Sequence, residues 1–177
     1  MTARPAKKAR AARPAVPPLP DLDALDQTHR QVMVVLGELQ QLIERLDDAG
    51  VDDTARQMAR EICAFFSGRA RQHHADEERI VFPGLLKSGD DELVQHVLRL
   101  QQDHGWLEED WLELAPQLEA VAQGYNWYDL DMLRQALPVF AALYQDHIAL
   151  EESLVYPEAR RRMEALRAGE AARSVEA

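Results

Sequence analysis

The stretch HHADEERIVFP, residues 73–83, places two ionisable side chains on the apolar side of a predicted helix. His73 and Glu77 are four residues apart, so in a helix they share a face with the apolar Ile80. A carboxylate on such a face loses its hydration and has to be compensated by a partner. The pattern returns at residues 147–157 as HIALEESLVYP, again with H-x-x-x-E and a Pro six residues beyond the Glu. The chain therefore repeats one unusual arrangement.

Apolar residues recur with the period of an α-helix along most of the chain, and no segment alternates as a strand does. Four helices are predicted, over about residues 20–48, 52–87, 90–123 and 127–168. Asn126 is expected to cap the last of them, and Met33 and Leu154 are expected to face inward. Long helices joined by short loops favour an all-α fold, an up-down-up-down antiparallel four-helix bundle.

The third and fourth predicted helices restate the first and second. His29 precedes His104 by 75 residues, and His73 precedes His147 by 74 residues. A nearly constant offset indicates two helical hairpins related by a pseudo-twofold axis. Each hairpin carries one lone His and one H-x-x-x-E motif.

Positions seven residues before and after each of these histidines are apolar, which places all four imidazoles on inward faces. Helix axes in a bundle are only about 8–10 Å apart, so the imidazoles and the two motif glutamates should meet in one small volume. A single inward His is usually an ordinary core residue, but two buried carboxylates without a cation would repel each other. The predicted metal ligands are His29, His73, Glu77, His104, His147 and Glu151.

Imidazole nitrogen and carboxylate oxygen are ligands that suit iron, manganese or zinc. The chain has a single cysteine, Cys63, and the lack of further thiolates argues against copper(I) and iron–sulfur clusters. Two ions fit the ligand count better than one, because each ion would take two histidines while both glutamates bridge. Open positions would then remain on each ion.

With these motifs, the chain resembles hemerythrin-like proteins of the HHE cation-binding family over roughly residues 20–165. The resemblance implies a four-helix bundle with a non-haem di-iron centre, in which two iron ions are bridged by two carboxylates and an oxo or hydroxo group. It also implies binding or sensing of dioxygen, nitric oxide or peroxide. The family's ligand positions fall on His29, His73, Glu77, His104, His147 and Glu151.

The chain departs from the oxygen carriers of this family at two positions. Those proteins have H-x-x-x-H on the third helix, whereas this chain has Glu108 four residues after His104. Their last bridging residue is an Asp five residues after the final His, whereas Glu151 follows His147 by four residues. Simple reversible oxygen carriage is therefore not favoured. Glu108 is expected to be a seventh ligand, a hydrogen-bond partner at the site or a residue in contact with water.

Other residues near the motifs are predicted to lie outside the ligand set. His74 should turn about 100° away from His73, and His96 should lie at the surface or at the boundary between surface and core. Tyr144 is predicted either to form a hydrogen bond at the site or to pack in the core. Packing in the core or at helix ends is assigned to the tryptophans Trp106, Trp111 and Trp127.

Charge divides the chain into a basic tail and an acidic body. Residues 1–20 carry +5 and the whole chain carries −11, which leaves −16 for the remainder. We expect residues 1–19 to be a disordered tail, 20–168 to form the bundle and 169–177 to be a C-terminal tail. An acidic body disfavours nucleic acid as a partner. The lack of a secretory signal and of a long apolar span predicts no membrane association and a cytoplasmic location.

The predicted function is that of a di-iron module that carries, scavenges or senses a small diatomic ligand or peroxide. One alternative is a di-iron enzyme or iron donor, with peroxidase-like turnover or repair of iron–sulfur centres. Another alternative is a metal-stabilised structural bundle that binds a protein partner, for which the basic tail is the only hint. The sequence favours a binding protein over an enzyme.

Overall fold

The computed structural model describes the backbone of residues 21–175 and the side chains up to residue 169. The predicted tail of residues 1–19 lies outside the described residues. Within the described part, the chain forms four helical rods and no strand. The first rod is α1 (Leu22–Ala49) and the third is α5 (Asp91–Gln123).

The second and fourth rods are continuous helices interrupted by π-helical segments, which carry the label η. The second rod consists of α2 (Asp53–Ala64), η1 (Phe65–Ala70), α3 (Arg71–Asp76), η2 (Glu77–Val81) and α4 (Phe82–Leu86). The fourth rod consists of α6 (Leu130–Leu150), η3 (Glu151–Val155) and α7 (Tyr156–Val175).

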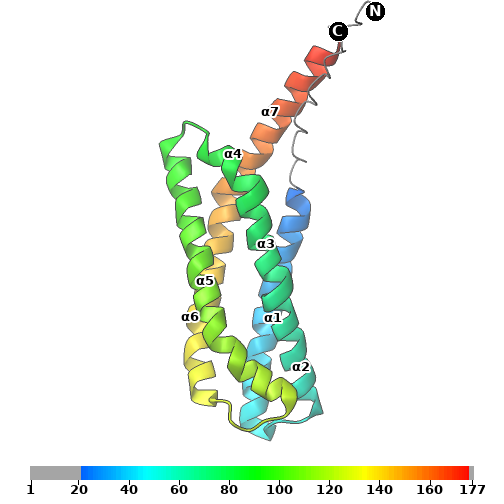
Figure 1. Cartoon of the computed structure of the whole chain (residues 1–177), viewed down its shortest axis with the longest axis vertical. Helices are drawn as coiled ribbons and strands as arrows, with labels where there is room; N and C mark the ends of the chain where they lie inside the picture. The colour runs from blue at the N-terminus through cyan, green and yellow to red at the C-terminus, as the bar shows by residue number, and fades with distance from the viewer. Residues whose placement is uncertain (1–20, 176–177) are drawn as a thin grey trace, which may run out of the picture.

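The four rods pack as the predicted up-down-up-down bundle. Both α1 and α5 pack against α2 and α6, so each rod touches two neighbours around a square. The rods run side by side along the long axis of the molecule, and α7 continues beyond the bundle as a single helix (Figure 1). This last helix extends to Val175, past its predicted end at residue 168.

Each rod begins after an aspartate whose side chain accepts a hydrogen bond from the backbone N–H three residues further on: Asp21, Asp52, Asp90 and Asp129. These bonds satisfy backbone donors that the first turn of a helix leaves free. The prediction that Asn126 caps the fourth rod is wrong. Asn126 is exposed in the preceding connection, whereas the N–H of Asp129 donates to the side chain of Gln117 at 2.7 Å. This bond to α5 sets the start of the fourth rod at Leu130.

Two apolar clusters, each with residues from all four rods, fill the bundle. The larger cluster includes Phe66, Trp111 and Phe140. The smaller cluster includes Phe82 and Tyr156. Buried polar residues separate the two clusters and form a layer across the bundle, which we call the polar layer. Its members are Thr28, His29, His73, Glu77, Asp103, His104, His147 and Glu151.

Several apolar residues predicted to be inside are largely exposed. Met33 is 42% exposed because Val32 occupies the inward position, and one residue further turns about 100° around the helix. Trp106 is 47% exposed and does not pack in the core. Trp127 is 61% exposed and stacks on Tyr125 just before α6, at the helix end that was the other predicted place for the tryptophans. Leu154 is 47% exposed for a different reason, the π-helical segment η3 described below.

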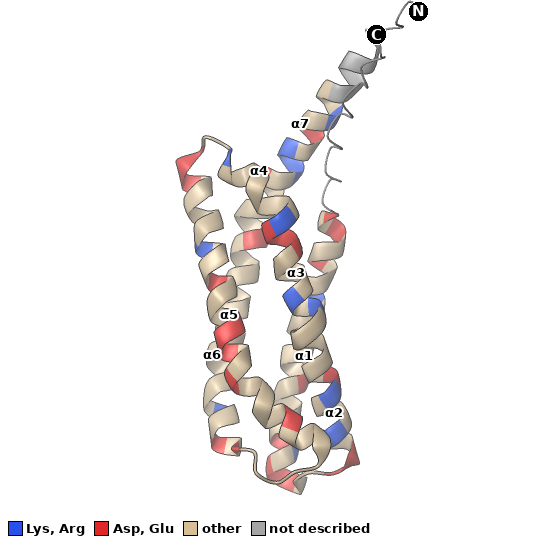
Figure 2. Ribbon diagram, viewed as in Figure 1, with Lys and Arg blue, Asp and Glu red and all other residues tan. Residues whose placement is uncertain are grey.

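Acidic side chains are distributed over all four rods, whereas three consecutive arginines lie on α7 (Figure 2). Arg160 forms ion pairs with Asp23 and Asp26 on α1, at 2.8 and 2.5 Å. The two arginines that follow pair with Glu158 on their own helix. None of the helices within residues 21–175 combines the length and apolar character that crossing a membrane requires.

Candidate metal centre

The six residues predicted as metal ligands meet in the polar layer. Three rods supply one histidine each through α1, α5 and α6, and α3 supplies the fourth. The two glutamates are the first residues of η2 and η3. All six side chains are buried, with exposed fractions of 0–6%. They are His29, His73, Glu77, His104, His147 and Glu151.

The six side chains form two groups that share both glutamates. One group contains the histidines of the first hairpin, and the other contains the histidines of the second. Within each group, the candidate ligand atoms are all within 4.8 Å of one another. This arrangement offers two cation positions, each with two imidazoles, joined by two carboxylates. The groups are His29, His73, Glu77 and Glu151, and His104, His147, Glu77 and Glu151.

One oxygen of each glutamate lies close to histidines on two rods. The Oε2 atom of Glu77 is 3.4 Å from Nε2 of His73 and also 3.4 Å from Nε2 of His104. The Oε2 atom of Glu151 is 3.1 Å from Nε2 of the α1 histidine and 3.3 Å from Nε2 of the α6 histidine. Carboxylate oxygens and imidazole nitrogens therefore face the same small space from all four rods.

Both glutamates begin a π-helical segment, and the two segments occupy equivalent positions in the repeat. A π-helical turn contains one residue more than an α-helical turn, and such turns are frequent at functional sites. The extra residue moves the inward position from the seventh to the eighth residue after the motif histidine. Val81 and Val155 are therefore buried, whereas Ile80 is half-buried and Leu154 is exposed.

A second glutamate follows each buried one and orients a histidine of the opposite hairpin. The Nδ1 atom of His29 is 3.0 Å from a carboxylate oxygen of Glu152, and Nδ1 of His104 is 2.9 Å from one of Glu78. A hydrogen bond from Nδ1 leaves Nε2 with its lone pair free for a metal. We did not predict these contacts, although the Glu-Glu doublet in both motifs was a visible signal.

The residue before the motif Pro differs between the two repeats, and sequence reasoning did not assign a role to it. Phe82 stacks against His104, with ring centroids 5.7 Å apart, and Tyr156 stacks against His29 at 5.3 Å. The Tyr156 hydroxyl also donates a hydrogen bond to Oε1 of Glu77. One cation position therefore has a phenol beside it where the other has only a phenyl ring.

Burial shifts the pKa values of several ligand candidates. It lowers the pKa of His73 to about 3 and also lowers the pKa of His104, so both are neutral imidazoles. Burial and the charge of Glu151 raise the pKa of Glu77 well above its usual range. Burial acts in the same direction on Glu151, but His147 outweighs it and holds the pKa of Glu151 low. Two facing carboxyl groups can both be charged only if a cation compensates them.

Unpaired polar atoms gather at the same place. Among the described residues, most of the buried side-chain nitrogen and oxygen atoms without a hydrogen-bond partner belong to the polar layer. Leaving such atoms unpaired costs about 1–3 kcal/mol each. Coordination to cations would satisfy the Nε2 atoms and the carboxylate oxygens of the two glutamates among them, so the residues present fit a metal centre. The atoms are Nδ1 of His73, Oε2 of Glu77, Oδ2 of Asp103, Nε2 of His104, both ring nitrogens of His147 and both carboxylate oxygens of Glu151.

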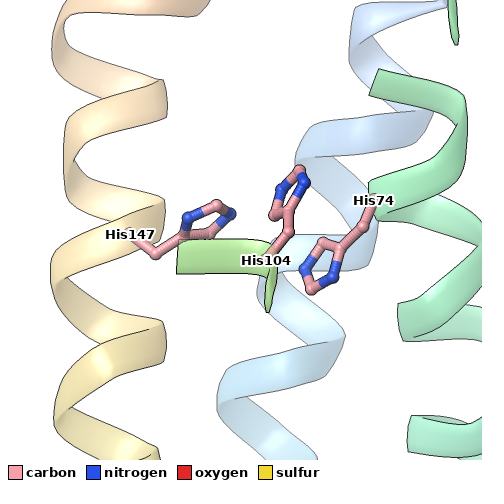
Figure 3. Close-up of side chains that lie close together, drawn as sticks. All are labelled: His74, His104 and His147. Atoms are coloured by element: carbon pink, nitrogen blue, oxygen red, sulfur yellow. The ribbon is translucent and has the colours of Figure 1, made fainter. Parts of the chain in front are cut away.

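His74 lies at the centre, and the prediction that it turns away from the ligand set is wrong. Its ring centroid is 4.1 Å from that of His104 and 5.5 Å from that of His147. Figure 3 shows the three side chains lying close together. The second rod has neighbours on two sides, α1 and α5. A turn of about 100° from His73, which faces His29, therefore points His74 toward α5 and not toward solvent.

The remaining candidates lie outside the centre. Glu108 is 3.1 Å from the guanidinium of Arg71, and it joins neither group of ligand candidates. His96 is half-buried next to Glu92, with 4.0 Å between its Nε2 atom and a carboxylate oxygen. Tyr144 packs in the larger apolar cluster and has no hydrogen bond among the described residues, which settles the choice left open for it.

Comparison with known proteins identifies the family. The model of the hemerythrin HHE cation binding domain matches residues 21–159. The chain belongs to the hemerythrin HHE cation-binding family. An uncharacterised protein of Haemophilus influenzae is 30% identical over 126 residues, which cover 71% of each chain. No solved structure matches the chain. The hemerythrin HHE match spans all four rods, and together with the buried His and Glu clusters it indicates a metal-binding bundle.

Proposed function

We propose that the protein binds two iron ions in the polar layer and that this di-iron centre binds dioxygen, nitric oxide or peroxide. The observation that carries the proposal is the pair of four-residue groups that share Glu77 and Glu151. Two carboxylates common to two histidine pairs are the arrangement that a bridged two-metal site requires. Nitrogen and oxygen donors without thiolate suit iron, and the family match supports a cation in this place.

The chain's own residues would divide between the two ions according to the hairpins. His29 and His73 would hold one ion, and His104 and His147 would hold the other. Glu77 comes from the first hairpin and Glu151 from the second, so each hairpin would contribute a carboxylate to both ions. When bound, the iron pair supplies redox-active positions at which a small ligand can coordinate.

The surroundings restrict what can reach the centre. No ligand candidate is more than 6% exposed, and apolar clusters lie on both sides of the polar layer. A hollow of about 300 Å³ between α1 and the second rod is lined in part by Thr28, Gly68 and His73. Burial of the candidate ligands favours small molecules such as dioxygen, nitric oxide or peroxide over large substrates.

Metal analysis tests the di-iron proposal directly. We expect protein loaded anaerobically with ferrous iron to retain two irons per chain. Glu77→Gln and Glu151→Gln remove one bridging charge each, and both variants should retain less than one iron. His96→Gln, which changes a histidine outside the centre, should retain two. Wild-type protein that retains no iron, or that prefers a single zinc, would overturn the proposal.

Ligand additions then separate the possible activities. We would reduce the loaded protein and follow its absorbance as dioxygen, nitric oxide or peroxide is added. A reversible change indicates binding by a carrier or sensor, and continuous loss of peroxide indicates an enzyme. A loaded protein that responds to none of the three would leave the metal with a structural role and contradict ligand binding.

Peroxidase-like turnover is the second candidate function, and one observation favours it. The Tyr156 hydroxyl donates to Glu77 and lies 3.4 Å from Nε2 of His29, so a buried proton donor adjoins one cation position. A donor in this place can supply a proton to a reacting oxygen. The test is repeated consumption of peroxide by the loaded protein in the presence of an added electron donor. Tyr156→Phe should slow this consumption when it is compared with wild type at an iron concentration that keeps both proteins fully loaded.

A further inference from the structure

The two cation positions are related by the sequence repeat, but one has an additional imidazole beside it. His74 follows the first motif histidine directly, and the residue at the equivalent place in the second repeat is Ile148. The repeat therefore provides a histidine on one side of the bundle and an aliphatic side chain on the other. This difference is independent of the six residues that carry the proposed function.

His74 forms a third compact cluster of potential ligands with His104 and His147. The ring nitrogens that these three residues offer lie within 4.8 Å of one another. The three imidazoles come from α3, α5 and α6 and converge between these rods (Figure 3). The His74 ring lies at 14° to the ring of His104 and at 69° to that of His147.

No other contact among the described residues accounts for the polar atoms of His74. Its neighbours are rings, including those of His73 at 5.6 Å and Tyr144 at 5.9 Å, and neither of its nitrogens forms a hydrogen bond within residues 21–169. His29 and His104, by contrast, are each held by a carboxylate at Nδ1. His74 thus has both nitrogens free beside a candidate metal position.

Glu108 could also serve as a ligand near His104, but an ion pair with Arg71 holds its carboxylate away from the centre. Glu108 lies one turn after His104 on α5, but its carboxylate pairs with Arg71 at 3.1 Å. Arg71 precedes His74 by three residues on the second rod. The same short helix therefore binds Glu108 at the outside and presents an imidazole on the inside.

We propose that His74 is a metal ligand, the third histidine of the ion held by His104 and His147. This inference rests on the proposed di-iron centre and deepens it. The two ions would then be inequivalent, one with three imidazoles and two carboxylates and the other with two imidazoles and two carboxylates.

Mössbauer spectroscopy of protein loaded with the iron-57 isotope tests this ligand set. The wild-type ferrous protein should give two quadrupole doublets of equal area and different splitting. His74→Ile, which copies the residue of the second repeat, should shift one doublet and leave the other in place. It should also weaken binding of one iron at least about tenfold, while the other iron is retained. His96→Ala serves as the control and should leave both doublets unchanged.

Chemical rescue distinguishes a ligand from a packing residue. In His74→Ala, one of the two doublets should move away from its wild-type splitting. Free imidazole added to this variant should return that doublet to the wild-type splitting. If His74→Ile and His74→Ala bind two irons with wild-type affinity and unchanged doublets, the third ligand is excluded, even if their melting temperatures fall. That result leaves the di-iron proposal intact. A wild-type protein that binds no iron overturns both proposals together.

Discussion

Consecutive glutamates in each repeat point in different directions. Glu77 is fully buried and faces the histidines, whereas Glu78 is 43% exposed and reaches His104 from outside. Glu151 and Glu152 divide in the same way, with side-chain exposures of 0% and 48%. Because Glu78 and Glu152 each contact the opposite hairpin, they fix the orientation of the lone histidines across the bundle.

Tyr156→Phe should weaken metal binding without unfolding the protein. Phe82 occupies the equivalent position in the first repeat, so a phenyl ring fits against an imidazole in this packing. The variant removes the hydrogen bond to Glu77, and the loss of such an outer partner lowers metal affinity by roughly 10–100-fold. Titration with ferrous iron measures the affinity. Tyr125→Phe, at an exposed ring, is the control, and equal affinities for the two variants would contradict the role of the hydroxyl.

The positions of the six candidate ligands could be predicted because they depend only on helical periodicity and the repeat. The surroundings of His74 could not be predicted. The sequence gives the angle between His73 and His74 around the helix, but it does not say whether solvent or another helix lies in the direction of His74. The role of Tyr156 was missed for a similar reason. Its hydroxyl contacts Glu77, 79 residues away in the chain, and only the packing of the rods brings the two together.

At the scale of the elements, helical periodicity did not predict the π-helical segments, and it therefore placed the residues within them incorrectly. A fixed period of 3.6 residues places Leu154 inside, whereas the extra residue of η3 puts Val155 there instead. Because η2 and η3 both begin at a buried glutamate, the extra residue comes directly after the carboxylate in both repeats. This coincidence suggests that the wider turn positions the carboxylate.

Deletion of Leu154 tests that idea. The deletion removes an exposed residue and lets the segment close into an ordinary α-helix, while the residues that follow keep their inward register. We expect the fold to be retained. The affinity for iron should fall by about tenfold, because the π-helical turn no longer orients the Glu151 carboxylate. Circular dichroism and iron titration measure the two effects.

The matched control is deletion of Leu112, which is also exposed but lies within the α-helical α5. That helix has no extra residue, so this deletion rotates every later inward side chain and should unfold the protein. Unchanged iron affinity after deletion of Leu154 would show that the π-helical turn has no part in metal binding.

The cap of α2 should make stability depend on acid pH. Asp52 accepts hydrogen bonds from Arg45 and from the N–H of Ala55, and the Arg45 bond is the main cause that lowers its pKa to about 2. Its stabilising effect is complete above the ordinary pKa of 3.8 and is lost as the pH falls toward about 2. Asp52→Asn keeps a capping side chain without the charge.

We therefore expect metal-free Asp52→Asn to melt below metal-free wild type at pH 7. The difference should shrink between about pH 4 and pH 2, as the Asp52 carboxylate is protonated in the wild type. Thermal unfolding at several pH values measures it. If the difference in melting temperature between the two proteins stays constant with pH, helix capping, and not the ion pair with Arg45, accounts for the stability that Asp52 contributes.

At the scale of the whole molecule, the polar layer interrupts an otherwise apolar interior. Unpaired carboxylates and imidazoles separate the two apolar clusters, so the metal-free bundle has its least stable packing at its centre. Cations in this layer would bind the folded state and not the unfolded chain. Metal binding and folding should therefore be coupled.

Iron should raise the melting temperature substantially. An ion present at a hundred times its dissociation constant adds about 2.7 kcal/mol to the free energy of unfolding. For a domain of this size, each kcal/mol corresponds to roughly 2–4 °C. Calorimetry of chelated and iron-loaded protein measures the increase, and Glu77→Gln should show little of it. Identical melting temperatures for the two wild-type samples would contradict coupling.

The loop between Leu86 and Asp91 joins the two hairpins, and its position has a consequence for fragments of the chain. A cut there would leave each fragment with one pair of histidines, either His29 and His73 or His104 and His147, but with only one of the two shared glutamates. Neither fragment could complete a centre alone, and the two together could. Separately expressed halves should thus reassociate in ferrous solution and come apart under chelation, which would turn the divided protein into a reporter of available iron.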